Sequence, residues 1–238
     1  MAYPNPPELS IIIPTINRSG RINQIYKLIS AELARDSYSY EIVFIDDGSN
    51  DNTAEIVRNI CKSDHGVKMI KLDKNYGEHC AIYAGLKISQ GKTLVIMHDD
   101  MGDNVKDINK FLQAINSGGD VVCGWRSPRY GAPLARRMIS YFLNLYFSSI
   151  IGVRIHDFGC GLKAFRKEAL TCGNSHLDIL RQLKKYRFLE IKIKSVNLEK
   201  SRYRPLKLLR LLWNILFFPP WEKYSEALTF SIAESYNL

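Results

Sequence analysis

Val95-Ile96-Met97-His98-Asp99-Asp100 is the most informative stretch of this 238-residue chain. A short apolar run ends abruptly in an imidazole and two carboxylates. In a chain that alternates strands and helices, acids at the carboxyl end of a strand lie where such folds bind ligands. Paired carboxylates there are typical of a hard divalent cation, which commonly holds phosphate. The alternative interpretation is a strand that ends in a solvated acidic turn.

Strand and helix patterns alternate on both sides of this stretch. Continuous apolar runs predict buried strands, and apolar residues three and four apart predict helices. The expected strands cover residues 9–14, 41–45, 67–72, 93–97 and 121–123, and the expected helices cover residues 22–33, 53–62, 77–89, 105–115 and 134–153. Asn52 and Glu55 have the spacing of a capping pair for the helix that begins at Thr53. The repeated units predict an α/β fold, with a mostly parallel sheet flanked by helices.

The composition favours an anionic partner. Lys and Arg number 33 against 24 acids, which gives a formal net charge of +9. Such a charge suits a nucleotide, a lipid phosphate, an anionic membrane face or nucleic acid. The sequence contains no recognisable nucleic-acid-binding module, and its basic residues cluster beside apolar stretches, so we do not expect nucleic acid as a partner. The five cysteines show no paired spacing, which favours reduced thiols in the cytoplasm.

Two stretches, residues 134–153 and 205–218, are rich in large apolar side chains and carry basic residues. Each is either a packing helix or a helix that lies on a membrane surface. Residues 206–218 fall short of the roughly 20 apolar residues that a membrane-spanning helix needs. Residues 1–7 lack the charged start and apolar core of a signal peptide. From Trp221 onward the pattern weakens, which predicts a loosely ordered tail.

Five motifs occur in a familiar order along the chain. They are Ile11–Asn17, Asp46–Thr53, Asn75–Gly77 with Ala84–Leu86, His98–Asp100, and Asp157–Arg166. With these motifs the chain resembles the family 2 inverting glycosyltransferases of GT-A fold. Within that family it is similar to the group of dolichyl-phosphate mannose synthases and bacterial polyprenyl-phosphate sugar transferases. The resemblance covers about residues 8–170.

The resemblance implies a Rossmann-like GT-A domain over residues 5–170 and a C-terminal, acceptor- and membrane-facing part without transmembrane helices over residues 171–238. The implied reaction moves a sugar, with inversion, from a UDP- or GDP-linked donor to polyprenyl phosphate or a glycan hydroxyl. The implied location is cytoplasmic, with peripheral contact to the anionic inner face of the membrane. The alternative is a degenerate relative that binds a nucleotide or a partner and transfers no sugar, because His98, Gly102 and a short C-terminal part depart from the family pattern.

The resemblance also implies which residues serve the donor. The implied nucleotide-binding residues are Pro14, Thr15, Asn17, Asp46, Asp47, Asn75, Gly77 and Asp99. Among them, the acidic pair would hold the base or the ribose. Capping and turn formation are the alternative roles of that pair.

The implied cofactor is Mg²⁺ or Mn²⁺. Asp100 is the expected principal ligand and a catalytic residue, and Asp99 or His98 supplies the second contact. His98 occupies the position where the family motif has its first acid. Imidazole is a poor ligand for Mg²⁺ but an acceptable one for Mn²⁺. Alternatively, His98 is a plain polar residue at a strand end.

Asp157 is the expected catalytic base if the acceptor is a hydroxyl, whereas a lipid phosphate is already ionised and needs positioning more than deprotonation. A loop acid that orders the neighbouring glycines is the alternative role of Asp157. The residues expected to bind acceptor or phosphate are Arg126, Arg129, Arg136, Lys200, Arg202 and Tyr203. A solvated basic loop is the alternative for the arginines.

Overall fold

The structure is a computed structural model that describes residues 6–35, 38–100, 102–127, 134–170, 183–194 and 231–238. The strands in these residues are β1 (Leu9–Thr15), β2 (Tyr40–Asp46), β3 (Val67–Leu72), β4 (Thr93–Met97), β5 (Val121–Arg126), β6 (Leu162–Arg166), β7 (Phe188–Ile193) and β8 (Ile232–Tyr236). The α-helices are α1 (Ile22–Leu33), α2 (Thr53–Ser63), α3 (Glu78–Ile88), α4 (Ile108–Asn116) and α5 (Leu134–Ile151). Short 3₁₀ turns cover Gly102–Asp107, Lys167–Ala169 and Leu183–Lys185.

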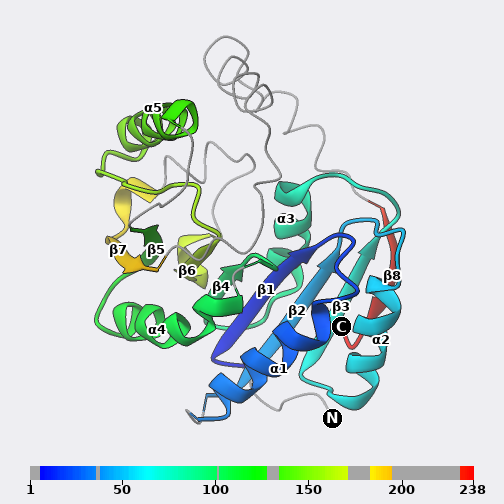
Figure 1. The fold of residues 1–238 in the computed structure, drawn as a ribbon. Coiled ribbons are helices and arrows are strands. Elements are labelled where there is room, and N and C mark those ends of the chain that lie inside the picture. The colour runs from blue at the N-terminus through cyan, green and yellow to red at the C-terminus, as the bar shows by residue number, and fades with distance from the viewer. Residues whose placement is uncertain (1–5, 36–37, 101, 128–133, 171–182, 195–230) are drawn as a thin grey trace.

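The strands form one sheet in the order β7-β5-β6-β4-β1-β2-β3-β8 (Figure 1). β1 lies between β2 and β4 and is parallel to both, and β3 continues the parallel part beside β2. β6 runs antiparallel between β4 and β5, and β8 runs antiparallel along β3. Because β1, β2 and β4 are parallel, the loops that follow Thr15, Asp46 and Met97 all leave the sheet at the carboxyl ends of these strands, which is the edge where the site residues lie.

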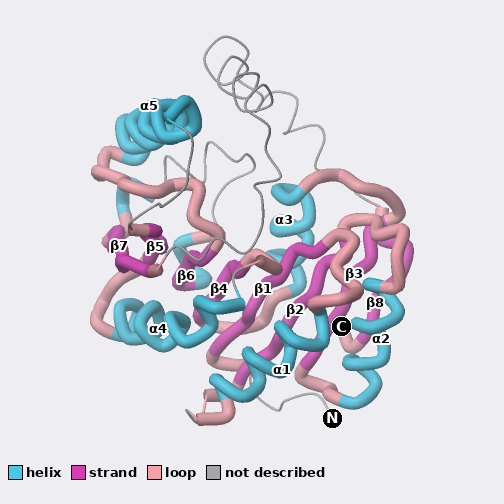
Figure 2. The backbone as a smooth tube through the Cα atoms, in the orientation of Figure 1, coloured by secondary structure: helices cyan, strands magenta, loops and turns pink. Residues whose placement is uncertain are grey.

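Helices cover both faces of the sheet, as the tube view shows (Figure 2). One face carries Ile11, Ile13 and Phe44, which pack in one buried cluster with residues of α1, α2 and α4. The other face carries Ile12 and Ile45, which pack with residues of α3 and with the end of α5. This alternation along β1 is the two-residue period of a strand buried on both sides.

Gly85 lets α3 lie close to the sheet. A Cβ atom at this position would lie 2.6 Å from both Ile12 Cγ2 and Ile45 Cδ1, which is closer than real Cβ contacts come. The absence of a side chain at Gly85 therefore lets α3 pack closely against Ile12 of β1 and Ile45 of β2.

The predicted strands and helices up to residue 151 are present, with ends shifted by a few residues. The expected cap is wrong, because Asn52 makes no side-chain capping bond and Asp51 Oδ1 instead accepts the Thr53 N–H at 3.0 Å. The described cysteines, Cys61, Cys80, Cys123 and Cys160, are buried and free, as expected.

The described residues beyond 170 belong to the same sheet. β7 pairs with β5 and β8 pairs with β3, so both extend the sheet that residues 5–170 begin. The expectation of a loosely ordered tail is wrong for residues 231–238, where Arg58 holds Glu234 at 2.7 Å and the Asn237 amide donates to two backbone carbonyls. Residues 205–218 lie outside the described residues. Within the described part of the chain, every helix is too short or too polar to cross a membrane.

Candidate active site

Asp47 ties the end of β2 to the segment before α3. Its Oδ1 accepts the Tyr76 N–H at 2.8 Å and its Oδ2 accepts the Gly77 N–H at 2.9 Å. Gly48 has a φ of +70°, and a Cβ there would lie 2.4 Å from the backbone of Lys74, so only glycine fits this crossing. Burial raises the pKa of Asp47, although the two N–H donors oppose that shift. The acidic motif and the Asn75–Gly77 motif therefore lie against each other and form one side of the candidate site, the nucleotide wall.

Asp46 is completely buried at the end of β2. Its Oδ1 accepts from the N–H of Ser49 at 3.0 Å and from the Ser49 hydroxyl. Its Oδ2 is buried, and the described residues give it no hydrogen-bond partner. Burial raises the pKa of Asp46 against the hydrogen bonds from Ser49. Since buried polar atoms are normally paired, Oδ2 is an acceptor suited to a donor that the described residues do not supply.

The loop after β1 joins the end of β4 through Asp99. Thr15 Oγ1 and Arg18 Nε both donate to Asp99 Oδ2 at 3.2 Å. Asp99 is only 3% exposed, and burial raises its pKa to about 6 although Arg18 opposes the shift. Asn17 adopts a φ of +52° and fastens the same loop to the loop after β2, because its N–H donates to Ser49 Oγ.

His98 faces the first turn of α3. Its Nε2 lies 2.6 Å from Glu78 Oε1, and its backbone N–H donates to the carbonyl of Gly161. A Cβ at Gly161 would lie 2.5 Å from His98 Cγ, so the imidazole packs directly on the glycine motif that precedes β6. Burial alone would raise the pKa of Glu78, but the hydrogen bond and charge of His98 lower it overall.

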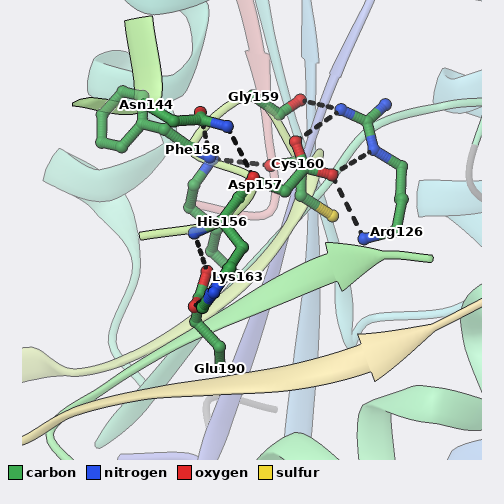
Figure 3. A network of polar contacts seen from close by, with 9 residues as sticks. All are labelled: Arg126, Asn144, His156, Asp157, Phe158, Gly159, Cys160, Lys163 and Glu190. Carbon is green, nitrogen blue, oxygen red and sulfur yellow. Dashed lines mark hydrogen bonds and ion pairs between the residues drawn. The ribbon is translucent and has the colours of Figure 1, made fainter. Parts of the chain in front are cut away.

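Asp157 and Arg126, both expected on the acceptor side, form an ion pair at the end of β5 (Figure 3). Arg126 donates from its backbone N–H at 3.2 Å and from Nε at 2.8 Å to Asp157 Oδ2, and from Nη2 at 3.0 Å to Oδ1. The same Nη2 donates to the Gly159 carbonyl at 2.8 Å. Burial opposes the charge of Arg126, but Asp157 raises its pKa, and the charge of Asp100 adds to that rise. Asp100 therefore lies within electrostatic range of the Arg126–Asp157 pair.

The loop that carries Asp157 is fixed from two sides. Asn144 of α5 donates to the His156 carbonyl at 2.5 Å and accepts the Phe158 N–H at 3.1 Å. Glu190 of β7 accepts the His156 N–H at 2.8 Å and lies 2.6 Å from His156 Nδ1. Figure 3 shows these contacts around Asp157. The loop around Asp157 is thus held in a set conformation by α5 and β7.

The sequence model described as Glycosyl transferase family 2 matches residues 10–173, which is more than half of the chain. The chain belongs to glycosyl transferase family 2. The matched residues include all five motifs described above.

Two curated relatives of this family 2 member have names that include a polyprenyl phosphate. One is the dodecaprenyl-phosphate galacturonate synthase of Rhizobium johnstonii, 27% identical over 175 residues, which are 71% of this chain and 52% of that protein. Another is the undecaprenyl-phosphate 4-deoxy-4-formamido-L-arabinose transferase of Edwardsiella ictaluri, 30% identical over 217 residues, which are 87% of this chain and 66% of that protein. The chain therefore spans about half to two thirds of the length of these curated relatives.

Solved structures share the fold. The glucosyl-3-phosphoglycerate synthase of Mycobacterium tuberculosis, solved with Mn²⁺, UDP and phosphoglyceric acid, matches with a TM-score of 0.64 at 16% identity over 88% of this chain and 78% of its own. The mannosyl-3-phosphoglycerate synthase of Rubrobacter xylanophilus matches with a TM-score of 0.66 at 14% identity over 97% of this chain and 84% of its own. These similarities confirm the predicted GT-A fold.

The structure brings together the donor-side residues that the sequence predicted for this glycosyl transferase family 2 chain. Pro14 and Thr15 end β1, Asp46 ends β2 and Asp47 follows it, and Asn75 Oδ1 accepts the Gly77 N–H at 2.9 Å. Arg129, Lys200, Arg202 and Tyr203 lie outside the described residues, and the side chain of Arg136 is not described. Arg18 and Glu78 were not predicted. The signal that could have found them is that each is a charged residue beside a predicted motif.

The described residues contain no cluster of three His, Cys, Asp or Glu side chains that could enclose a metal ion. A divalent cation bound to a diphosphate needs only one or two protein carboxylates, because phosphate and water oxygens fill the other positions. The exposed Asp100, close to the buried carboxylate of Asp99, meets that smaller requirement. The donor set of this family 2 chain therefore fits Mg²⁺ or Mn²⁺ held together with a diphosphate.

Proposed function

We propose that this chain transfers a sugar, with inversion, from a UDP- or GDP-linked donor to polyprenyl phosphate, with Mg²⁺ or Mn²⁺ as cofactor. One observation carries the proposal, a set of side-chain contacts between motifs. They join the loop after β1 to the end of β4, the loop after β2 to the segment before α3, the end of β4 to the start of α3, and the end of β5 to the motif before β6. The names of the relatives support polyprenyl phosphate as the acceptor.

On the donor side, Asp46 and Asp47 are suited to the nucleoside, since Asp46 Oδ2 is a buried acceptor with no described partner. Asp100 is suited to the cation, because its carboxylate is exposed beside Asp99. When bound, the cation neutralises charge on the leaving nucleoside diphosphate. Thr15 and Arg18 hold Asp99, and so keep the β4 end in place beside the nucleotide motifs.

On the acceptor side, the contacts of Asp157 favour a phosphate over a glycan hydroxyl. Both carboxylate oxygens accept hydrogen bonds from Arg126, and the residue is completely buried. A general base must reach the proton that it removes. A lipid phosphate is ionised already and needs only to be positioned. Arg126, held by Asp157 with about a quarter of its side chain exposed, is suited to that positioning.

The exposed face of α5 supports peripheral contact with an anionic membrane on its cytoplasmic side. Met138, Tyr141, Phe142 and Leu145 recur three and four residues apart on α5 and are each more than half exposed. Arg137 is exposed next to them. An apolar helix face bordered by basic charge is the pattern of a helix that lies in the membrane interface. Such contact would bring the site to a lipid-linked acceptor.

The second candidate function is nucleotide binding without transfer. Its specific support is His98, which occupies the first acidic position of the motif and is engaged by Glu78. This candidate predicts that a nucleotide sugar binds the protein and that no sugar moves to any acceptor.

The experiment compares the wild-type chain with Asp100→Asn and with Glu55→Gln, a control in an exposed acid on the first turn of α2. Melting temperatures with UDP- and GDP-sugars, with and without Mn²⁺, identify the donor, because a ligand of the native state raises its melting point. Transfer to undecaprenyl phosphate in anionic vesicles is then measured with that donor. We expect transfer by the wild type and by Glu55→Gln, and none by Asp100→Asn. Full transfer by Asp100→Asn would refute the role of Asp100, and binding without transfer by the wild type would favour the second candidate.

A further inference from the structure

His98 is held in a position that leaves its ring nitrogens little freedom. Nε2 lies 2.6 Å from Glu78 Oε1. On the other side of the ring, a Cβ at Gly161 would lie 2.6 Å from Nδ1 and 2.5 Å from Cγ, so the backbone of Gly161 packs against that edge. Nε2 is therefore engaged by Glu78, and the Nδ1 edge of the ring lies against the backbone of Gly161.

Asp99 is engaged as well. Its Oδ2 accepts from Thr15 and Arg18, and the side chain is almost completely buried. Of the three residues expected to bind the cation, only Asp100 has an exposed carboxylate. A cation that takes two carboxylates along with a diphosphate needs another acid at this edge.

Glu78 is an acid of this kind. It begins α3, directly after Gly77, whose N–H donates to Asp47, and its negative charge contributes to the raised pKa of Asp47. Its Oε1 contacts His98, while its Oε2 has no hydrogen bond or ion pair to the described residues. Its side chain is 36% exposed, and Oε2 is not among the buried unpaired side-chain atoms of the described residues. Glu78 therefore lies between the nucleotide wall and the acidic end of β4.

We infer that Glu78 replaces the acid that the motif lacks at position 98, and that Glu78 and Asp100 together hold the divalent cation of the donor. The inference rests on the proposed function. Hard cations prefer carboxylate oxygen to imidazole nitrogen, which favours Glu78 over His98 as the ligand. A hydrogen bond from a neighbouring side chain commonly orients a ligating carboxylate. His98 is then a positioning residue, which holds Oε1 and leaves Oε2 for the cation.

The test measures Mn²⁺ binding to the full chain by electron paramagnetic resonance, in the presence of UDP or GDP, whichever raises the melting temperature more. Glu78→Gln keeps an oxygen for His98 but removes the charge, and we expect it to weaken Mn²⁺ binding by at least about tenfold, the lower bound for removing even an orienting partner. Glu55→Gln, the matched acid on the first turn of α2, should bind Mn²⁺ as the wild type does.

His98→Asp restores the missing acid and provides the second arm. In this background Glu78→Gln should lose little affinity, so that the double variant binds Mn²⁺ far better than Glu78→Gln alone. Spin-echo modulation of the bound Mn²⁺ reports directly coordinated nitrogen, and we expect none in the wild type. Unfolding curves without ligand establish that each variant is folded.

Unchanged Mn²⁺ affinity in Glu78→Gln, or the strong coupling of a directly bound nitrogen in the wild type, would overturn the inference and leave the proposed function standing. If the wild type binds the nucleotide but no Mn²⁺, the cation of the proposed function fails together with the inference. Equal loss of affinity from Glu78→Gln in the wild-type and His98→Asp backgrounds would overturn the replacement of one acid by the other.

Discussion

The ion pair of Arg126 and Asp157 allows a test between two roles for Asp157, which are to position Arg126 or to act as a catalytic base. The Asp157 side chain is 1% exposed and accepts three hydrogen bonds from Arg126, whose side chain is 26% exposed. Asp157→Asn removes the charge and brings an NH₂ group toward these donors. Breaking a buried ion pair by removing one partner costs about 3–5 kcal/mol. Because Arg126 remains partly solvated, we expect the lower end, a loss of about 3 kcal/mol in the free energy of unfolding.

The assay is equilibrium unfolding in urea of a double-mutant cycle formed by Arg126→Ala and Asp157→Ala. The coupling free energy isolates the pair from the other contacts of each residue. The matched control is Arg58 with Glu234, a pair of similar length, 2.7 Å, whose side chains are 27% and 32% exposed. Because both of its side chains are partly solvated, this pair should give a coupling of about 1 kcal/mol or less.

Transfer activity completes the comparison. If Asp157 positions Arg126, then Asp157→Asn and Arg126→Ala should lower transfer to polyprenyl phosphate together, and the stability loss should accompany both. An Asp157→Asn protein with wild-type stability and no transfer would refute the reasoning, since that is the behaviour of a free catalytic base.

Three further outcomes follow from individual contacts. Gly85→Ala should destabilise the protein by about 1–3 kcal/mol in urea unfolding, because its Cβ would press on Ile12 and Ile45; an unchanged midpoint would contradict this. Asn237→Ala should cost about 1–2 kcal/mol and speed amide exchange in β8 first, since its Nδ2 donates to two carbonyls at 2.8 Å; uniform exchange would contradict this. For Asp51, hydrogen bonds from Thr53 and Ser19 outweigh slight burial and lower its pKa from 3.8 to about 2. The stability that it contributes is therefore complete above about pH 4 and lost as the pH falls toward 2, and Asp51→Asn should flatten that part of the melting profile.

The fold could be predicted where the pattern along the chain is local. β1 to β4 are apolar runs buried on both faces, and the helices between them show regular spacing, so residue order alone places them. β7 and β8 could not be predicted in this way. Their side chains are mixed and mostly half-buried or exposed, and their partners, β5 and β3, lie far away in the sequence. Pairing of that kind depends on backbone hydrogen bonds at the sheet edge, which leave little trace in composition.

The site shows the same division. The motif residues Thr15, Asp47 and Asp99 were predicted because they stand in motifs that resemble those of a known family. Arg18 and Glu78 were missed because what makes them important is a contact between loops: Arg18 with Asp99, and Glu78 with His98. Each of these two side chains is identified by the group that it contacts in the fold, and no residue spacing in the sequence marks it.

The charges at this edge of the sheet argue against a site that has simply decayed. The chain carries a net charge of +9, yet five carboxylates gather at the ends of β2 and β4 and the start of α3: Asp46, Asp47, Glu78, Asp99 and Asp100. Three of them, Asp46, Asp47 and Asp99, are at most 4% exposed. Burying like charges together costs stability unless cations or hydrogen-bond donors offset them. Arg18 and His98 account for two of the acids, while Asp100 is exposed and the side chain of Glu78 is 36% exposed. The arrangement is the one expected of a chain that still takes up a cation together with its donor, and it supports the inference that Glu78, on the first turn of α3, supplies the acid missing from β4.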